Sequence, residues 1–328
     1  MTSLLILLSL IALSFNINAD QGNFVSSNNK PNVTIGYNRL RISLPIFVAD
    51  QLGIFSKHGL NVHLEAYDTA SPMIQALAEN KLDMAGYSAL PIIFSAMNRS
   101  GKKFYFITKL LEDQKHRISY FLRPKITGKS TIINSIADIK GKRIGILPTT
   151  AYRAWLIAMA ATYGLKVNKD FTIQQIDPAQ QAIALKSGGI DALFTNDPVA
   201  TAIIASGIGE LVSDTVECPK YFGSPFIFGS FVIAKEWADD HPNEMRDIVD
   251  SLYEAIDFVN DYPSDANRLM IPYIAEQFKS QVELYPDARY EYLRPGDEAK
   301  FLNIISDYVK QKILDKPTTD IGSLLIIR

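Results

Sequence analysis

Short apolar segments that end in small polar residues and lead into helical segments recur along this chain of 328 residues. The clearest is DALFTNDP, residues 191–198, which precedes a helical run over residues 199–205. Residues 83–88 (DMAGYS) and 143–150 (RIGILPTT) have the same form. Each pattern predicts a strand and then a polar residue or Pro that begins a helix. Helix N-termini present unpaired N–H groups and a partial positive charge, so we expect ligands at these strand ends.

Strands and helices alternate in two stretches of the sequence, which is typical of an α/β protein with largely parallel sheets. The first stretch has predicted strands at residues 33–37, 83–87, 104–109 and 118–122, another strand ending at Leu64, and predicted helices at 40–52, 69–80 and 90–97. After a polar break at 127–130, the second has strands at 143–147, 171–175 and 191–195 and helices at 151–163 and 178–189. The pattern is completed by a strand at 230–234 and by helices at 242–260, 264–279 and 296–314. The apolar tail at 324–327 is expected to be tucked in or paired.

Composition and charge place the chain among ordinary globular proteins. It is 47% hydrophobic and 21% charged, with a net charge of −2. Its length is enough for about two domains. The near-neutral charge gives no basic field for nucleic acid, so we expect no nucleic-acid partner.

The first residues predict export. Residues 4–15 form an apolar run about as long as the hydrophobic region of a signal peptide, and Ala19 offers a cleavage position. We therefore expect residues 1–19 to be a signal peptide, cleaved near Ala19, and residues 20–32 to be a leader of the mature chain. A frayed N-terminal segment or a membrane anchor is the alternative.

Cysteine and histidine offer little chemistry. Cys218 is the only cysteine, which excludes an intrachain disulfide, a Cys-based zinc site and a lipid anchor on an N-terminal cysteine. The four histidines are scattered. No Ser/His/Asp order, paired carboxylates or Gly-rich phosphate loop stands out. We expect no metal, no cofactor and no catalytic site.

Five phrases in a fixed order carry a resemblance to a known family. They are LGIFSKHGLNVHL (52–64), ALAENKLDMAGYSALP (76–91), IADIKGKRIGILPTTAY (136–152), ALKSGGIDALFTNDP (184–198) and FVIAKEWADDHP (231–242). With them the chain resembles the periplasmic substrate-binding proteins of ABC importers, in the nitrate/sulfonate/taurine group. The resemblance covers roughly residues 33–260.

The resemblance implies a two-lobed α/β periplasmic-binding-protein fold of type II, each lobe a mostly parallel sheet flanked by helices, with two hinge crossings. It places lobe I at residues 33–115 and 222–328 and lobe II at 116–221. It further implies a monomeric, periplasmic binding protein, not an enzyme. This protein captures a small anionic solute, sulfonate-like or taurine-like, between the lobes and delivers it to an ABC permease with a cytoplasmic ATPase. A binder of a thiamine-precursor pyrimidine or another heterocycle, and an enzyme or sensor on the same fold, are the alternatives.

Candidate binding residues in lobe II lie at two of the helix starts. Thr149 and Thr150 offer hydroxyls beside helix N–H groups, and Arg153 stands in the first turn, a set that suits an oxyanion. Ordinary helix capping is the alternative role of the threonines, and Arg153 either faces the ligand or points away. Asp197 either pairs with a cationic group of the ligand or caps the helix that follows.

The candidate binding residues of lobe I follow strands or lie near a presumed crossing. They are Tyr37, Asn38, Ser88 and Phe226. Ser88 is also expected to cap a helix, and Phe226 and its neighbour Phe228 either pack on an apolar part of the ligand or belong to the core. Arg39 and Arg41 are close to these residues. Either one of them faces the anion, or both are solvated loop residues.

One departure from the resemblance concerns the solute. Taurine binders of this group carry an acid just before the strand predicted at 230–234, where it meets the ligand amine, whereas this chain has Phe228 and Gly229. They also carry a His where Ala151 stands. The differences speak against taurine itself, and a more apolar sulfonate or an aromatic or heterocyclic solute fits as well.

Overall fold

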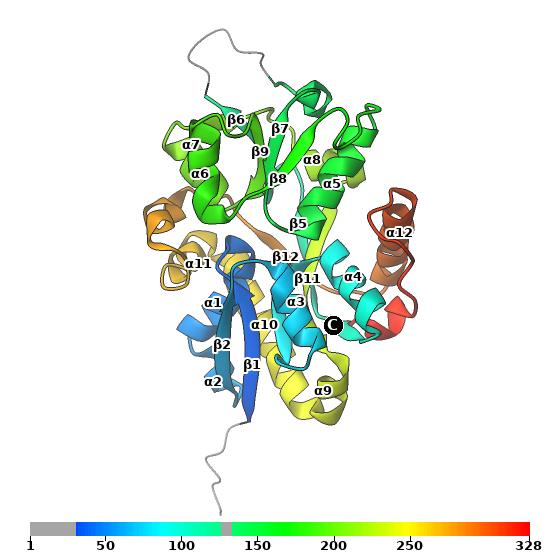
Figure 1. Cartoon of the computed structure of the whole chain (residues 1–328). Helices are drawn as coiled ribbons and strands as arrows, with labels where there is room; N and C mark the ends of the chain where they lie inside the picture. The colour runs from blue at the N-terminus through cyan, green and yellow to red at the C-terminus, as the bar shows by residue number, and fades with distance from the viewer. Residues whose placement is uncertain (1–30, 126–132) are drawn as a thin grey trace, which may run out of the picture. The chain divides into compact units, whose positions relative to one another are not determined.

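Two β-sheets flanked by helices contain the strands of the protein (Figure 1). The computed structural model describes residues 31–125 and 133–328, so the predicted signal peptide and most of the predicted leader lie outside the described residues. The large sheet contains β1 (Asn32–Asn38), β2 (Asn61–Tyr67), β3 (Met84–Ala89), β4 (Phe104–Phe106), β5 (Thr108–Glu112), β11 (Phe226–Ala234) and β12 (Arg289–Tyr292). The small sheet contains β6 (Ser119–Pro124), β7 (Arg143–Ile146), β8 (Thr172–Gln175), β9 (Ala192–Asn196) and β10 (Gly209–Leu211). The chain passes between the sheets after β5 and again after β10, as expected for two crossings.

Parallel pairing is confined to three neighbouring strands in each sheet. In the large sheet β1 pairs in parallel with β2 and β3, and in the small sheet β7 pairs in parallel with β8 and β9. The strands next to the crossings, β5, β6, β10 and β11, run antiparallel to their neighbours. The expectation of mostly parallel sheets therefore holds only for the three strands at one end of each sheet, since a chain that crosses directly into the other sheet has no helix to carry it back.

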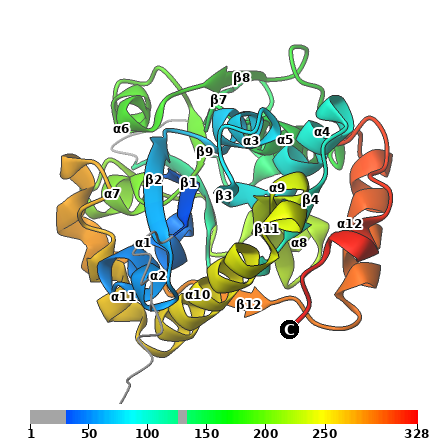
Figure 2. The ribbon, with the colours of Figure 1, turned by 90° about the horizontal axis from the view of Figure 1, so that it is seen from below.

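Helices flank both sheets. The α-helices beside the large sheet are α1 (Leu44–Gln51), α2 (Ile54–Lys57), α3 (Ala70–Ala78), α4 (Leu90–Ser100), α9 (Lys235–Asp240), α10 (Pro242–Asp261), α11 (Pro263–Leu269) and α12 (Asp297–Lys310). Those beside the small sheet are α5 (Thr150–Ala161), α6 (Pro178–Lys186), α7 (Val199–Ala205) and α8 (Glu217–Phe222). The short 3₁₀ helices are η1 (Arg41–Ser43), η2 (Ile136–Ile139), η3 (Glu276–Leu284) and η4 (Ile321–Leu324). Seen from below, α10 lies beside α1, α2 and α11, and α4 packs against α5 (Figure 2).

The predicted elements agree with most of this order. The helix predicted at 199–205 has the bounds of α7, and the apolar tail is paired as expected, because the Ile326 N–H donates to the Phe106 carbonyl over 2.9 Å. The single helix predicted at 264–279 is wrong: α11 ends at Leu269 and η3 begins only at Glu276. Pro272 lies between them and lacks the N–H that a continuous helix needs. None of the described helices combines the length and apolar character required to cross a membrane.

One buried carboxylate holds the chain in place at the first crossing between the sheets. Glu112, at the end of β5, accepts hydrogen bonds from the Ile118 N–H (2.8 Å) and from the N–H and hydroxyl of Ser119. The side chain is fully buried, and burial raises its pKa from 4.5 to about 7, against the effect of these hydrogen bonds. Glu112 therefore fixes the path on which the chain leaves the large sheet.

A buried ion pair links the two parts of the chain behind the crossings. The Arg41 Nε, from η1 beside the large sheet, lies 3.4 Å from the Asp197 Oδ2, at the end of β9 in the small sheet. The Arg41 guanidinium also donates to the carbonyls of Pro286 (3.0 Å) and Arg117 (2.8 Å). Only 2% of the Arg41 side chain and 1% of the Asp197 side chain are exposed. One side chain thus joins η1, the first crossing, the C-terminal segment and the small sheet.

Asp197 has its remaining hydrogen-bonding capacity satisfied within the small-sheet part. Its Oδ2 accepts from the Tyr120 hydroxyl (2.8 Å), and its Oδ1 accepts from the N–H (3.1 Å) and hydroxyl (2.7 Å) of Thr201 in the first turn of α7. These hydrogen bonds offset part of the cost of burying the carboxylate, whereas the Arg41 Nε has no hydrogen-bond partner among the described residues and meets Asp197 as an ion pair.

We expect the Glu112 carboxyl to make stability depend on pH. Its folded pKa lies above its unfolded pKa, so the folded chain holds a proton that the unfolded chain releases between about pH 4.5 and pH 7. Stability present below this interval is lost as the pH rises through it, by roughly 3 kcal/mol in total. Urea unfolding at a series of pH values should show that Glu112→Gln removes this loss. Glu276→Gln, at an exposed position, is the control, and equal pH slopes for all three proteins would contradict the prediction.

We expect Arg41 and Asp197 to be energetically coupled. Arg41→Met leaves a buried carboxylate without its cation and should lower the free energy of unfolding by about 3–5 kcal/mol. Asp197→Asn in the same protein should cost less than it does alone, because the uncompensated charge is already gone. Arg268→Met is the control, since Arg268 forms an exposed pair with Glu283 and should cost less than about 1 kcal/mol. Strictly additive costs in a double-mutant cycle would show that the pair is not coupled.

Candidate functional site

A small cavity lies between the two sheets and is lined by residues from both parts of the protein. Its volume is about 30 Å³, room for a solute group of only a few non-hydrogen atoms. Its lining is Asn38, Leu40, Ile42, Thr69, Ala70, Tyr87, Ala89, Ile92 and Phe228 from the large-sheet part, and Leu147, Thr149, Tyr152 and Asn196 from the small-sheet part. None of these described lining residues carries a charge at neutral pH.

The starts of three helices meet at this cavity. Thr69 is the N-cap of α3, Ala89 is the N-cap of α4, and Thr149 is the N-cap of α5. The Thr149 hydroxyl oxygen accepts from the Tyr152 N–H over 3.3 Å, which leaves its own proton free to be donated, and Thr69 makes no side-chain cap. Helix N-termini carry a partial positive charge, so the cavity favours an anion although no cationic side chain lines it.

Four buried polar atoms of the lining have no partner of hydrogen-bonding geometry among the described residues. They are the Asn38 Oδ1, the Tyr87 hydroxyl, the Tyr152 hydroxyl and the Asn196 Oδ1. All four side chains are at least nine-tenths buried. A buried polar group without a partner costs roughly 1–3 kcal/mol, so four around one cavity indicate a binding site.

Burial keeps the two tyrosines protonated. It raises the pKa of Tyr87 and that of Tyr152 well above the ordinary value of 10.0, and each remains a hydroxyl that can donate. The nearby side chain of Asn196 opposes the rise at Tyr152, which places these two groups close together. Tyr87 and Tyr152 line the same cavity, so a hydroxyl from each part of the protein is available there.

An aromatic wall supports both tyrosines. The Phe228 ring lies 5.9 Å from the Tyr87 ring, 6.3 Å from the Tyr152 ring and 4.9 Å from the Trp155 ring. Gly229 follows Phe228 in β11, and a Cβ there would collide with the Ser88 backbone carbonyl and with the Tyr87 hydroxyl. The glycine therefore allows both the close approach of β3 and the position of this hydroxyl.

Two of the predicted binding residues, Asn38 and Thr149, line the cavity. Ser88 lies next to it, fully buried in β3, and its hydroxyl has no partner among the described residues. Our expectation that Ser88 caps a helix is wrong, because β3 continues to Ala89 and Ala89 is the N-cap of α4.

Other predicted residues lie away from the cavity. Tyr37 packs in the core against Phe47, with ring centroids 5.4 Å apart. Thr150 is exposed at the start of α5, and Arg153 is half-buried in the same helix. Asp197 is buried in its pair with Arg41.

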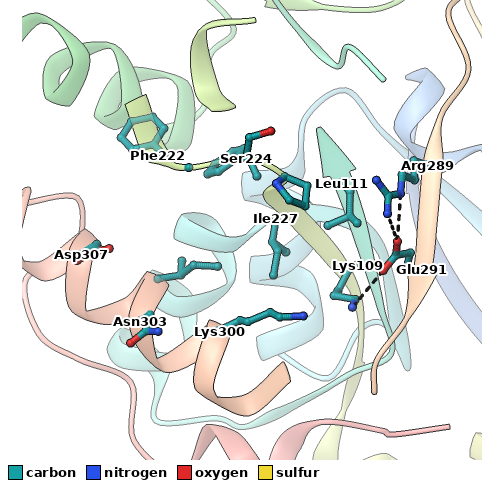
Figure 3. Close-up of a pocket in the computed structure, with 14 residues that line it drawn as sticks. Lys109, Leu111, Phe222, Ser224, Ile227, Arg289, Glu291, Lys300, Asn303 and Asp307 are labelled. Carbon is teal, nitrogen blue, oxygen red and sulfur yellow. Dashed lines mark hydrogen bonds and ion pairs between the residues drawn. The ribbon is translucent and has the colours of Figure 1, made fainter. Parts of the chain in front are cut away.

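Phe226 is the remaining predicted residue, and it lines a second, open cavity of about 440 Å³. Figure 3 shows this cavity, with Lys109, Glu291 and Arg289 on one side and Lys300 on α12 on the other. Its charged groups are already paired: the Lys109 Nζ lies 3.3 Å from a Glu291 oxygen and 2.8 Å from an Asp297 oxygen, and Arg289 pairs with Glu291 over 2.6 Å. These contacts join β5, β12 and α12, so we assign them a structural role.

The sequence did not identify Tyr87, Tyr152 or Asn196 as binding residues. Tyr87 ends an apolar strand and Tyr152 lies on an apolar helix face, so both have the pattern of core residues. The available signal was position, because each is next to a strand end or a helix start that the pattern had already marked. In residues 31–125 and 133–328, no group of three or more His, Cys, Asp or Glu side chains is placed to hold a metal ion.

Known proteins with similar sequences come from transport systems. The chain is 27% identical over 251 residues to the bicarbonate transport ATP-binding protein CmpC of Synechococcus elongatus, which covers 71% of this chain and 36% of CmpC. It is 24% identical over 270 residues to the nitrate/nitrite binding protein NrtA of the same organism, which covers 76% of this chain and 60% of NrtA. The chain thus spans about a third of CmpC and three-fifths of NrtA.

Solved structures share the fold. The alkanesulfonate-binding protein SsuA from Xanthomonas axonopodis pv. citri, bound to MOPS, matches with a TM-score of 0.70 and 17% identity, covering 92% of this chain and 100% of SsuA. The desulfurization enzyme DSZB matches with a TM-score of 0.62 and 15% identity, covering 90% of this chain and 96% of DSZB. These matches confirm the expected type II periplasmic-binding-protein fold, on which both binding proteins and an enzyme occur.

The sequence itself decides the family. The profile of the NMT1-like family matches residues 26–275, about three-quarters of the chain. The chain therefore belongs to the NMT1-like family.

Proposed function

We propose that this protein is an extracytoplasmic solute-binding protein, which encloses a small anionic solute in the cavity between the sheets and delivers it to an ABC importer. The observation that carries the proposal is the convergence of three helix N-termini and two buried tyrosine hydroxyls on one small cavity. The bicarbonate, nitrate and sulfonate named for CmpC, NrtA and SsuA are all small anions or carry one anionic group.

An anion held in this cavity is stabilised by dipoles instead of a countercharge. Hydrogen bonds from hydroxyls and N–H groups to an anion are worth about 1.5–3 kcal/mol each, and they require no buried cation. The neighbouring Asp197 does not repel the anion, because Arg41 neutralises it. The cavity volume of about 30 Å³ favours a compact head group.

Binding without catalysis fits the same lining. Among the described lining residues there is no Cys, His, Lys, Asp or Glu that would act as nucleophile or proton carrier at neutral pH. DSZB shows that the fold alone does not exclude an enzyme, so the argument rests on the cavity.

The two sheets correspond to two lobes in this proposal. Every strand of the small sheet falls in lobe II (116–221), and every described strand of the large sheet but the first residue of β1 falls in lobe I (33–115 and 222–328). Opening by rotation at the two crossings would separate Tyr152 and Asn196 from Asn38 and Tyr87, which line one cavity here, and would admit the solute. The apolar run at residues 4–15 supports export to the periplasm, and we propose a monomer that meets a membrane permease and its cytoplasmic ATPase.

A second candidate is a binder of an uncharged heterocycle. The aromatic rings of Phe228, Tyr87 and Tyr152 around an uncharged cavity favour it. A thermal-shift screen with nitrate, hydrogencarbonate, methanesulfonate and a set of pyrimidines separates the two, because a bound solute raises the melting temperature. Stabilisation by pyrimidines alone would replace the anion proposal.

We expect Tyr87→Phe and Tyr152→Phe each to weaken anion binding. Each removes one hydroxyl that would donate to the anion and keeps the ring, so the loss should be about 1.5–3 kcal/mol, roughly ten- to a hundredfold in Kd. Isothermal titration calorimetry with an anion found in the screen measures it. Tyr67→Phe removes an exposed hydroxyl that donates to Glu65 and is the control. Unchanged affinity in both cavity variants would place the solute elsewhere.

We also expect closure on binding. Small-angle X-ray scattering should give a smaller radius of gyration with a saturating solute than without it, since rotation at the two crossings brings the lobes together. The same curve in both conditions would contradict a hinge mechanism.

A further inference from the structure

The cavity holds acceptors as well as donors, and a bare oxyanion uses only donors. Nitrate and sulfonate groups carry no hydrogen at neutral pH, so they pair with hydroxyls and N–H groups alone. The Asn38 Oδ1 can only accept. A solute without an N–H or O–H would leave it buried and unpaired.

The orientation of the Asn38 amide is fixed by the protein. Its Nδ2 donates to the Tyr87 carbonyl over 2.7 Å, and reversing the amide would place two oxygens against each other. The Asn38 backbone N–H donates to the Ser43 hydroxyl (3.2 Å), which holds the residue at the end of β1. The Oδ1 is thus the polar atom that Asn38 offers to a solute. The Asn196 Oδ1 is likewise buried without a partner among the described residues, and the Asn196 side chain interacts with Tyr152.

Donors and the fixed acceptor come from neighbouring positions. Asn38 bonds to the backbone of Tyr87, whose hydroxyl is one of the two free donors of the cavity. On the small-sheet side, Tyr152 and Asn196 both line the cavity, and each has a buried polar atom without a partner among the described residues. Each side of the cavity therefore pairs a hydroxyl with an amide.

We propose that the solute is a small anion that keeps an O–H or N–H next to its charged oxygens, and that this hydrogen is donated to the Asn38 Oδ1. The inference rests on the proposed function and narrows it from small anions in general to hydrogen-bearing ones. Asn38 is then the residue that separates them from bare oxyanions.

Two matched pairs of ions test the inference in the full mature chain. Hydrogencarbonate and nitrate are both planar and singly charged, and only hydrogencarbonate has an O–H. Sulfamate and methanesulfonate are both tetrahedral and singly charged, and only sulfamate has N–H groups. The comparison is made within the pair whose ions fit the cavity. In that pair we expect calorimetry to show that the hydrogen-bearing ion binds roughly ten- to a hundredfold more tightly, because the ion without a hydrogen leaves a buried acceptor unpaired.

Asn38→Leu tests the residue assigned to this role. It removes the acceptor at similar size, so the preference within the pair should fall to about equal affinity. Asn98→Leu is the matched control, since the Asn98 Nδ2 also donates to a backbone carbonyl, that of Lys316 (2.9 Å), on the surface. The control should keep the full preference, and circular dichroism checks that both variants are folded. The wild-type comparison decides the inference even if Asn38→Leu does not fold.

The outcomes separate the two proposals. Equal or tighter binding of nitrate or methanesulfonate by the wild-type protein would overturn the hydrogen-donor inference and leave the anion-binding proposal standing. Binding of none of the four ions would overturn both. A preference for the hydrogen-bearing ion that survives in a folded Asn38→Leu protein would overturn the assignment to Asn38.

Discussion

The buried contact between Arg41 and Asp197 is the constraint on which the arrangement of the cavity depends. Arg41 lies between Leu40 and Ile42, which both line the cavity, and Asp197 follows Asn196, which lines it from the other side. The ion pair is therefore adjacent in sequence to cavity-lining residues of both parts of the protein. Because each charge is neutralised within 3.4 Å, the pair sets the position of the wall without giving the cavity a net field. The helix N-termini are then left as the dominant electrostatic feature in front of it.

The glycine at position 229 and the position of the Tyr87 hydroxyl depend on each other. Phe228 and Gly229 lie within β11, at the point of the chain where the resemblance implies the acid of a taurine binder. Without a side chain at Gly229, the Tyr87 hydroxyl occupies the space, and the Phe228 ring packs beside it. In the proposed function, this neutral donor meets an oxygen of the solute.

The sequence predicted what local pattern determines. Strands, helix starts and the positions Asn38 and Thr149 follow from alternation and capping, and both residues line the cavity. It did not predict what depends on distant residues. The short strand β12 is ordered by pairing with β5, and the role of Arg41 needs Asp197, which lies far along the chain. Pro272 indicates a break in the helix, whereas the periodic pattern around it predicts a continuous one. The sequence does not distinguish Tyr87 and Tyr152 from core aromatic residues. The cavity that they line forms only where the two parts of the protein meet.

A site built from dipoles has a consequence for selectivity. A buried lysine or arginine would attract every small anion that fits, with little regard to where its hydrogens lie. Hydroxyls, N–H groups and amide oxygens are directional, and a buried group left unpaired costs more than a paired one contributes. Discrimination in this cavity must therefore come from the match between the hydrogen-bonding pattern of the solute and that of Asn38, Tyr87, Tyr152 and Asn196. Anions of the same charge and shape still differ in where they carry hydrogen-bond donors and acceptors. A neutral cavity can therefore distinguish them by this difference.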